Sequence, residues 1–355
     1  MAGKSGKYLG ILWLATGIFV ATTGVIAQRA ATGRYSLTDL GTLGGATSEA
    51  SGVNILGEVV GSSTTADGMF HAFVYRSGRM FDLGTLTGGT VSYGTAIADS
   101  GVVVGYSGIN AYGPMFREFT QGFVWQDGAM RALGAVYCSC SFNARYGTSR
   151  AFAVSNAGRI VGDSETEIGG RFTHAFLWQE NAMGDLGAAM DRVSTSVAYG
   201  INDVDEVVGG INGRAFLVSD RIRQDLGVLP GHMSSDARAV NGKGQVVGHS
   251  LTAGGISHAF LWDRGTMREL GTLPGDAGSE ARAINVAGDV VGRGIPDLGT
   301  SQAVLWRDGA AVDLNTLITA TGWILTSATG INDAGQIVGA GLRDGQIRAF
   351  LLTPQ

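Results

Sequence analysis

The sequence predicts an all-β fold over residues 35–355: a seven-bladed β-propeller of four-stranded blades, closed by pairing of N- and C-terminal strands. Three observations predict it. Four short tracts each recur seven times in a fixed order. The tract Asp-Leu-Gly-Thr-Leu at 39–43 returns at intervals of roughly 40–50 residues, the length of a propeller blade. The composition, with 58 Gly, 5 Pro and 15% charged residues, is typical of strands joined by tight turns.

The first strand of each unit carries alternating small residues, as in Ser279 to Asn285. Because small side chains allow seven strands to crowd around one axis, we expect this strand to be innermost. A Ser or Thr begins it at 48, 92, 149, 196, 235, 279 and 326. The second strand is the Val-Val-Gly tract, found at 59–61, 103–105, 160–162, 207–209, 246–248, 290–292 and 337–339.

The third strand is apolar and the fourth is the Asp-Leu-Gly tract. The third lies at 72–75, 122–125, 175–178, 215–218, 259–262, 303–306 and 349–352. The copies of the Asp-Leu-Gly tract begin at Asp39, Asp82, Ala132, Asp185, Asp225, Glu269 and Asp313. The repeat is too long for a helical tetratricopeptide or ankyrin unit, and it matches four strands per blade.

Two of the four connections are short hairpin turns. In the turn between the first and second strands, Gly occupies the fourth position in six of seven copies, with Asp205 the exception, as expected where φ is positive. The other two connections vary in length and composition. Because strand direction alternates, both emerge on one side of the ring, which we call the variable face.

The order of the tracts also predicts how the ring closes. The repeats begin with a fourth strand, around Tyr35 to Leu40, and end with a third strand, Ala349 to Leu352. The two ends of the chain must therefore pair to complete one blade. A closed ring leaves no long exposed strand edge.

The first 27 residues predict export. Lys4 and Lys7 precede an apolar run from Tyr8 to Ala27, which ends in Val-Ile-Ala, small residues of the kind that a signal peptidase needs. We interpret 1–27 as a cleaved signal peptide and 28–34 as a short linker. An uncleaved anchor, with 8–27 in the membrane, is the alternative. Either interpretation places the propeller outside the cytoplasm: secreted, periplasmic or at the cell surface.

Charge excludes some partners. The chain has 25 basic and 30 acidic residues, a formal net charge of −5, and no basic stripe. Nucleic acid is therefore not an expected partner, and the only expected membrane contact is through residues 8–27.

Several tracts together resemble a known family. His-Ala-Phe at 71–73, 174–176 and 258–260, followed by Leu-Trp, Asp-Leu-Gly-Thr-Leu, Ala-Ile-Asn and Val-Val-Gly, resembles the HAF family of extracellular bacterial repeat proteins. The resemblance covers nearly all of the chain after residue 27. It implies export and a repeat fold, and it carries no general activity or catalytic set. The departures are Gln121-Gly122-Phe123, Gln302-Ala303-Val304, Arg214, Arg348 and Ala132.

Positions that hold a hydrogen-bonding side chain in every blade are interpreted as structural. The histidines of His-Ala-Phe are replaced by Gln or Arg in the other blades, so a strand-end tether explains them better than a ring of metal ligands. The acids of the Asp-Leu-Gly tract recur in the same way, which favours a turn or an inter-strand hydrogen bond over catalysis.

Residues that break the repeat on the variable face are the candidate ligand-binding residues. Aromatic rings beside carboxylates and Arg are typical of a sugar or peptide pocket. Ordinary solvated loop residues are the alternative for each of them. The candidates are Tyr137, Arg145, Tyr146, His232, Asp236, Asp276, Glu280 and Trp323.

The two cysteines, Cys138 and Cys140, lie in the longest insertion. In an oxidising compartment they form a small disulfide, bridge to another chain or stay as thiols. Two cysteines do not make a zinc site, and no calcium, His-Glu-x-x-His or phosphate-binding motif is present in the sequence. No metal and no cofactor is expected, although acidic loops leave Ca²⁺ open.

These observations predict an exported, non-catalytic propeller that binds an extracellular glycan, envelope component or protein through its variable face. An extracytoplasmic hydrolase or lyase acting at the same face is the alternative, because propellers support many chemistries. A structural surface or matrix component is the second alternative.

Overall fold

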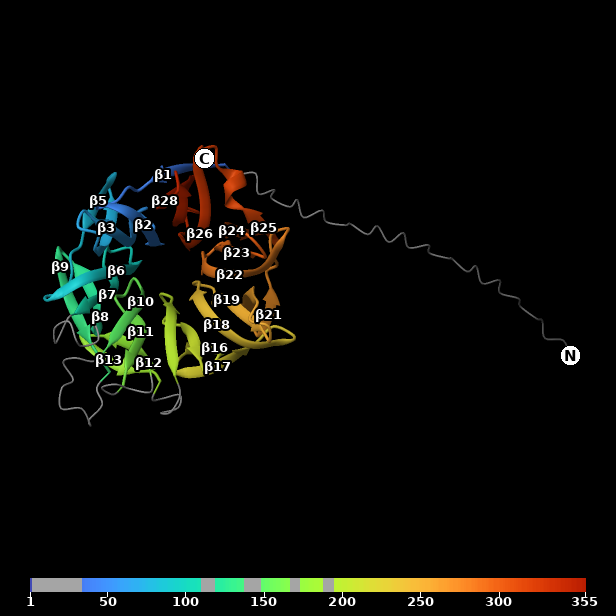
Figure 1. Ribbon diagram of the computed structural model, residues 1–355. Helices are drawn as coiled ribbons and strands as arrows, with labels where there is room; N and C mark the ends of the chain where they lie inside the picture. The colour runs from blue at the N-terminus through green and yellow to red at the C-terminus, as the bar shows by residue number, and fades with distance from the viewer. Residues whose placement is uncertain (2–33, 110–118, 137–147, 167–172, 188–194) are drawn as a thin grey trace. The chain divides into compact units, whose positions relative to one another are not determined.

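The first three tracts of each repeat form strands of a four-stranded antiparallel sheet, and seven such sheets surround a single axis (Figure 1). The fourth strand lies slightly earlier than predicted, because in five blades it ends at the acid that begins the Asp-Leu-Gly tract. The structure is a computed structural model that describes Met1 and residues 34–109, 119–136, 148–166, 173–187 and 195–355. The arrangement confirms the predicted seven-bladed propeller. We number the blades by their innermost strands in chain order, so blade 1 begins at Gly44 and blade 7 at Trp323.

The strands occupy four positions from the axis outward. The innermost are β2 (Gly44–Val53), β6 (Gly89–Ile97), β10 (Ser149–Val154), β14 (Ser196–Ile201), β18 (His232–Val240), β22 (Asp276–Ile284) and β26 (Trp323–Ile331). The second are β3 (Val59–Thr65), β7 (Val103–Ile109), β11 (Ile160–Glu165), β15 (Val207–Ile211), β19 (Val246–Thr252), β23 (Val290–Pro296) and β27 (Ile337–Arg343). The third are β4 (Phe70–Arg76), β8 (Phe119–Gln126), β12 (Thr173–Gln179), β16 (Arg214–Ser219), β20 (Ser257–Asp263), β24 (Gln302–Arg307) and β28 (Gln346–Pro354). The outermost are β5 (Arg79–Asp82), β9 (Ala129–Gly134), β13 (Ala182–Asp185), β17 (Ile222–Gly227), β21 (Thr266–Glu269), β25 (Ala310–Asp313) and β1 (Tyr35–Asp39).

The strand of small residues is innermost, as predicted. Each innermost strand contacts the innermost strands of both neighbouring blades. Its alanines, such as Ala151, Ala198 and Ala281, are fully buried where the blades meet. A larger side chain at these positions would push adjacent blades apart, so their small size is a packing requirement.

The glycine of the Val-Val-Gly tract is required by a close approach of two strands. A Cβ atom on Gly61 would lie 2.0 Å from the carbonyl oxygen of Glu49 on the innermost strand and 2.9 Å from the Phe73 ring. The space beside this glycine is filled by a fully buried Phe of the third strand in six blades, and by Val304 in blade 6. The six are Phe73, Phe123, Phe176, Phe216, Phe260 and Phe350.

The ring closes as predicted, by pairing of the two ends of the chain in blade 7. Strand β1 lies antiparallel to β28, with Tyr35 opposite Pro354 and Asp39 opposite Phe350. Outside the strands, the amide of Gln355 donates a hydrogen bond to the carbonyl of Arg34 at 2.9 Å. The closing contacts are backbone hydrogen bonds between sequence ends, and they give blade 7 the same four strands as the other blades.

A buried serine joins each of blades 1 to 6 to the blade before it. Ser92 Oγ accepts a hydrogen bond from the amide of Ala72 in blade 1 (2.8 Å) and donates one to the carbonyl of Gly84 (2.5 Å). The seventh interface is different. Thr326 donates to Ala340 within its own blade, and Asn315, in a 3₁₀ helix at Leu314–Leu317, bonds to both backbone groups of Leu325 instead.

The N-terminal segment that precedes the propeller is not described by the structure. The expected signal peptide or anchor falls within residues 2–33, which the structure does not describe. In the described part of the chain, no helix has the length and apolar character needed to cross a bilayer.

Candidate functional site

Alternate side chains of the innermost strands point toward the axis and line a central channel. At one position in each blade, the side chain lines a cavity of about 560 Å³ in this channel. This position follows the small Ala or Gly of the Ser-x-Ala pattern. We call these seven residues the channel ring: Ser51, Thr95, Phe152, Tyr199, Arg238, Arg282 and Thr329.

The channel ring has three sectors of different chemistry. Hydroxyl residues occupy the adjacent blades 7, 1 and 2, where they are Thr329, Ser51 and Thr95. Aromatic residues occupy blades 3 and 4, and arginines occupy blades 5 and 6. The backbone at this position is the same in every blade, whereas the side chain differs from sector to sector. The fold therefore does not require these particular side chains.

The aromatic and arginine sectors are in contact. The guanidinium carbon of Arg238 lies 4.0 Å from the centre of the Tyr199 ring, and the Tyr199 and Phe152 rings are 5.5 Å apart. On the other side, Arg150 lies 5.4 Å from the centre of the Phe152 ring. Cation–π contacts of this kind hold a guanidinium in place without using its N–H donors.

A second layer of charged residues lies nearer the variable face, because each innermost strand runs from that face toward its hairpin turn. Here Arg150 donates two hydrogen bonds to Asp163 on the neighbouring strand, at 3.0 and 2.5 Å. Arg293 donates two to Glu280, at 2.9 and 3.1 Å. These charges therefore satisfy one another within their own blades.

The channel environment shifts several pKa values. Burial raises the pKa of Glu280, but the hydrogen bond and charge of Arg293, followed by the charges of His249 and Arg282, outweigh it, so the net pKa is lowered. Burial lowers the pKa of His249, and Arg238 lowers it further. Burial also raises the pKa of Tyr199. At neutral pH the channel therefore holds an ionised Glu280, a neutral His249 and a protonated Tyr199.

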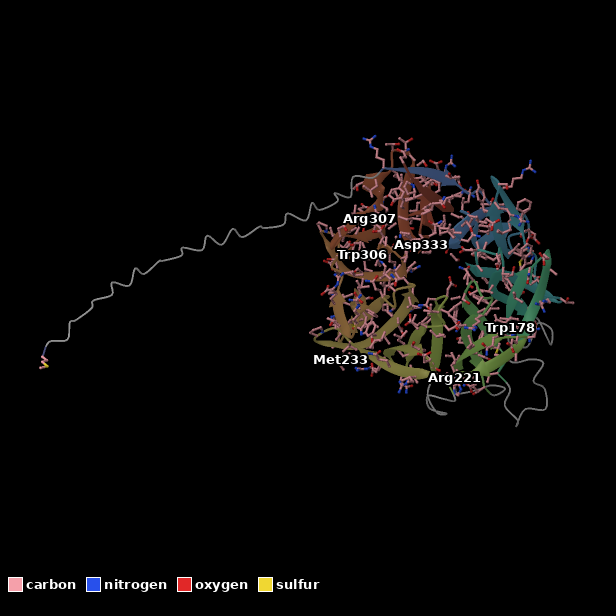
Figure 2. All side chains as sticks on the ribbon, turned by 180° about the vertical axis from the view of Figure 1, so that it is seen from behind. Trp178, Arg221, Met233, Trp306, Arg307 and Asp333 are labelled. Atoms are coloured by element: carbon pink, nitrogen blue, oxygen red, sulfur yellow. The ribbon has the colours of Figure 1, made fainter. Side chains whose placement is uncertain are left out.

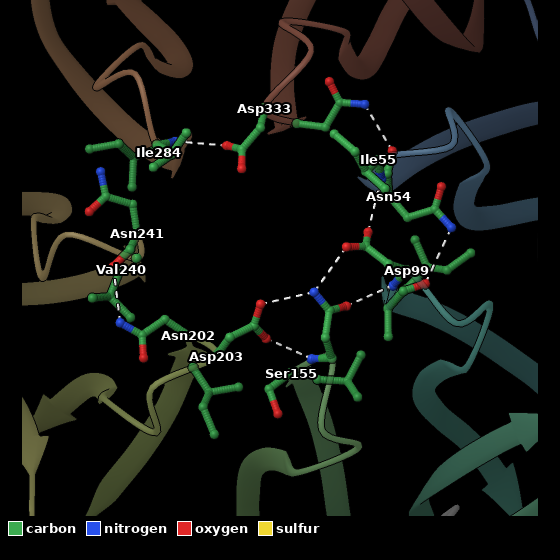
Figure 3. Close-up of a pocket in the computed structure, with 18 of the residues that line it drawn as sticks. Asn54, Ile55, Asp99, Ser155, Asn202, Asp203, Val240, Asn241, Ile284 and Asp333 are labelled. Atoms are coloured by element: carbon green, nitrogen blue, oxygen red, sulfur yellow. Dashed lines mark hydrogen bonds between the residues drawn. The ribbon is translucent and has the colours of Figure 1, made fainter.

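The hairpin end of the channel is built from repeated residues. Five buried asparagines at the start of the hairpin turns each donate a hydrogen bond to a carbonyl of the next blade, as Asn332 does to Asn54 at 2.8 Å. Their bonds run around a cavity of about 320 Å³ that all seven blades line (Figure 3). The five are Asn54, Asn202, Asn241, Asn285 and Asn332.

Acidic residues surround the same opening. The carboxylates of Asp99 and Asp203 both accept hydrogen bonds from the side chain of Asn156, each at 2.9 Å (Figure 3). The carboxylate of Asp333 accepts a hydrogen bond from the amide of Val286 at 2.8 Å. Asp333 lies beside the central opening (Figure 2). Every one of these carboxylates links two blades, so they complete the architecture of this end.

The histidines of His-Ala-Phe act as tethers. His71 Nδ1 lies 2.9 Å from Asp82, and the matching pairs are His174 with Asp185 at 3.0 Å and His258 with Glu269 at 2.7 Å. Each pair joins the third strand to the acid of the Asp-Leu-Gly tract in the same blade. Arg214 contacts Asp225 at 3.3 Å in the same way, which explains why Arg replaces His there.

The structure separates the candidate residues that the sequence singled out. Asp236 and Glu280 belong to the charged layer of the channel, where Asp236 Oδ2 lies 3.9 Å from Arg238. His232 packs edge-on against His258, with ring centres 5.1 Å apart. Its neighbour Met233 lies at the periphery of the ring (Figure 2).

Of the remaining candidates, Asp276 and Trp323 do not line the channel cavity. Burial and the charge of Asp313 raise the pKa of Asp276. Trp323 packs edge-on against Phe350 with ring centres 6.5 Å apart, which is a core contact. Tyr137, Cys138, Cys140, Arg145 and Tyr146 lie outside the described residues. Within the residues described, no three His, Cys, Asp or Glu side chains group closely enough to hold a metal ion.

Sequence reasoning missed Tyr199, Arg238 and Arg282. They sit inside the tract that was interpreted as architecture because its Ser and Ala repeat. The signal was present: the fourth position of the Ser-x-Ala-x-Ala pattern carries Ser, Thr, Phe, Tyr and Arg in different blades. The change of residue at a position where the backbone repeats was the available signal for the channel ring.

Comparison with solved structures supports the fold. The β-propeller domain of the trilobed protease from Pyrococcus furiosus is 10% identical with a TM-score of 0.50, covering 87% of this chain and 97% of that one. The structure described as YCF48 bound to D1 peptide is 10% identical with a TM-score of 0.50, covering 90% and 94%. A prolyl endopeptidase is 12% identical with a TM-score of 0.50, and the match covers 79% of this chain but only 42% of the endopeptidase.

These similarities extend to the fold and no further, because the identities are low. The search of curated proteins found no match. A family model described as a protein of unknown function (DUF3466) matches residues 120–349, more than half of the chain.

Proposed function

We propose that this chain, which belongs to the DUF3466 family of proteins of unknown function, is an exported, non-catalytic propeller that binds an extracellular ligand in its central channel. The ligand enters from the variable face and is a glycan, an envelope component or a segment of a protein. Export rests on the apolar segment 8–27 and on the HAF resemblance, and the family match over residues 120–349 confirms neither.

The observation that carries the proposal is the channel ring. Its cavity of about 560 Å³ falls in the size range of small-molecule sites. The cavity brings together hydroxyl, aromatic and cationic side chains at positions that the repeat leaves free to vary. By contrast, the groups that repeat in each blade already bond to one another.

The test is a binding and turnover screen of the purified protein against glycans and peptides, with and without Ca²⁺. We expect at least one ligand to bind and to be released unchanged. Binding should weaken when Tyr199 is replaced by Ala and should survive replacement of the exposed rim residue Arg264. Absence of binding to every class would refute the proposal.

A hydrolase or lyase acting in the same channel is the second candidate, and His249 is the observation that favours it. This imidazole lines the cavity, and burial keeps it neutral and able to accept a proton. Turnover of a bound ligand that is lost in His249→Gln would establish this candidate in place of a binding protein.

A further inference from the structure

Two of the four channel arginines donate no hydrogen bond to any described residue. Arg150 and Arg293 each donate two bonds to a carboxylate. Among the described residues, Arg238 and Arg282 have no hydrogen-bond partner for their guanidinium groups. Their nearest carboxylate oxygens are on Asp236 at 3.9 Å and on Glu280 at 3.8 Å, beyond hydrogen-bond distance.

The two arginines occupy neighbouring blades and share one cavity. About a third of each side chain is exposed, at 33% for Arg238 and 34% for Arg282. A half-buried guanidinium has lost part of its hydration, and without a hydrogen-bonding anion that loss is not recovered. Burial, and then the nearby charges of Arg293 and Arg238, lower the pKa of Arg282. This direction is expected for a guanidinium whose positive charge is not fully balanced by nearby anions.

Tyr199 adds a neutral donor beside them. Its ring lies under Arg238 and its hydroxyl is protonated at neutral pH. Across the channel, Thr95 and Thr329 already donate their hydroxyl protons to backbone carbonyls, at 2.9 and 2.8 Å. Their oxygens therefore remain available as acceptors, which suits a ligand that brings its own hydroxyl groups.

We propose that Arg238 and Arg282 together bind the carboxylate of an acidic sugar, whose ring hydroxyls face Ser51, Thr95 and Thr329. The inference deepens the proposed function and rests on it. A guanidinium presents paired N–H groups that match the two oxygens of a carboxylate, and two guanidiniums from adjacent blades can hold one carboxylate from both sides.

Charge balance favours a carboxylate over a phosphate. The four arginines of the channel are matched in number by Glu49, Asp163, Asp236 and Glu280, all of which act on the channel groups. The site therefore has a surplus of donors without a large surplus of positive charge. A monoanion satisfies those donors, whereas a phosphate dianion would be repelled more strongly by the same four carboxylates.

Ligand-observed NMR titration of the full chain with glucuronate tests the inference, with glucose, acetate and inorganic phosphate as comparison probes. We expect glucuronate to bind more tightly than any of the three. Arg238→Gln and Arg282→Gln should each weaken glucuronate binding by about tenfold or more, since each removes charge-assisted hydrogen bonds. Arg264→Gln is the matched control, because Arg264 is 94% exposed in an outer turn, and it should leave binding unchanged.

Each contrary result has a distinct meaning. Equal binding of glucose overturns carboxylate recognition, and tighter binding of phosphate overturns the choice of anion. If glucuronate does not bind but another ligand binds and is lost in Tyr199→Ala, the acidic-sugar inference fails and the proposed function stands. If no ligand binds at all, both fail. If either Gln variant does not fold, the Arg282→Lys variant tests the inference instead. It keeps the positive charge but loses the paired N–H groups of the guanidinium, and it should still weaken glucuronate binding several-fold.

Discussion

The hairpin end and the middle of the central channel are built on the same seven strands and differ in one respect. At the hairpin end, Asn332 and Asp333 belong to sets whose polar groups bond to a neighbouring blade. In the middle, Arg238 and Arg282 leave their donors unpaired. Since unpaired donors that are partly removed from water reduce stability, residues that keep them are candidates for binding, and residues whose donors are paired are interpreted as architecture.

Breaking the hairpin end should produce the largest effect, on stability. Asn332→Ala removes hydrogen bonds to the carbonyl of Asn54, the side chain of Gln336 and the amide of Gln336. We expect the free energy of unfolding to fall by about 2–3 kcal/mol, with ligand binding unchanged. Urea denaturation of the wild-type protein and of Asn332→Ala measures this difference in the free energy of unfolding.

The matched control is Ser155→Ala. Ser155 occupies the same turn position in blade 3 but accepts only one bond, from the amide of Arg159 at 3.3 Å. Its loss should cost less than about 1 kcal/mol. Equal losses in the two variants would show that the inter-blade bonds do not stabilise this end.

The middle of the channel should give the molecule a pH dependence. His249 has a lowered pKa in the folded state, so below pH 6.5, the ordinary pKa of histidine, the unfolded chain binds a proton that the folded chain does not. Stability therefore falls as the pH drops from 6.5, by at most about 1.4 kcal/mol for each pH unit. Thermal unfolding between pH 5 and 7 should show this slope, and His249→Gln should remove it.

Glu280 acts in a separate pH window. Its pKa is lowered in the folded state, so the stability it contributes is complete above its ordinary pKa of 4.5 and is lost as the pH falls through the lower folded value. A slope above pH 5 that persists in His249→Gln would therefore point to another group.

Removing a carboxylate from the middle of the channel should change glucuronate affinity more than removing one from the hairpin end. Glu280→Gln deletes the negative charge nearest Arg282 and frees donors of Arg293. We expect glucuronate to bind several-fold more tightly, as repulsion between carboxylates is lost. Asp99→Asn, at the hairpin end, should change affinity less. Isothermal titration calorimetry of both variants compares the two regions directly.

The smallest effect should come from Tyr199→Phe. This substitution keeps the ring that supports Arg238 and deletes only the hydroxyl donor. We expect glucuronate binding to weaken roughly threefold, the effect of one neutral hydrogen bond. A loss as large as that of Arg238→Gln would mean that the hydroxyl, and not the guanidinium, is the principal donor.

Much of the fold could be predicted from the sequence because the repeat encodes local structure. Positive φ at the fourth turn position was expected from Gly57 and its equivalents, and the structure has φ of 77° at Gly57 and 68° even at Asp205. The exception at the seventh interface, where Asn315 replaces the usual serine, could not be predicted, since it depends on a helix formed between two blades.

The sequence by itself determined the number of blades, the order of their strands and the closure of the ring, because each follows from spacing and from turn chemistry. Only the tertiary structure decided which residues meet in the channel. Tyr199 and Arg238 lie in different blades, and their contact depends on the side-by-side packing of two innermost strands. Whether a polar group is satisfied depends on such neighbours, so the site became visible only once the blades were assembled.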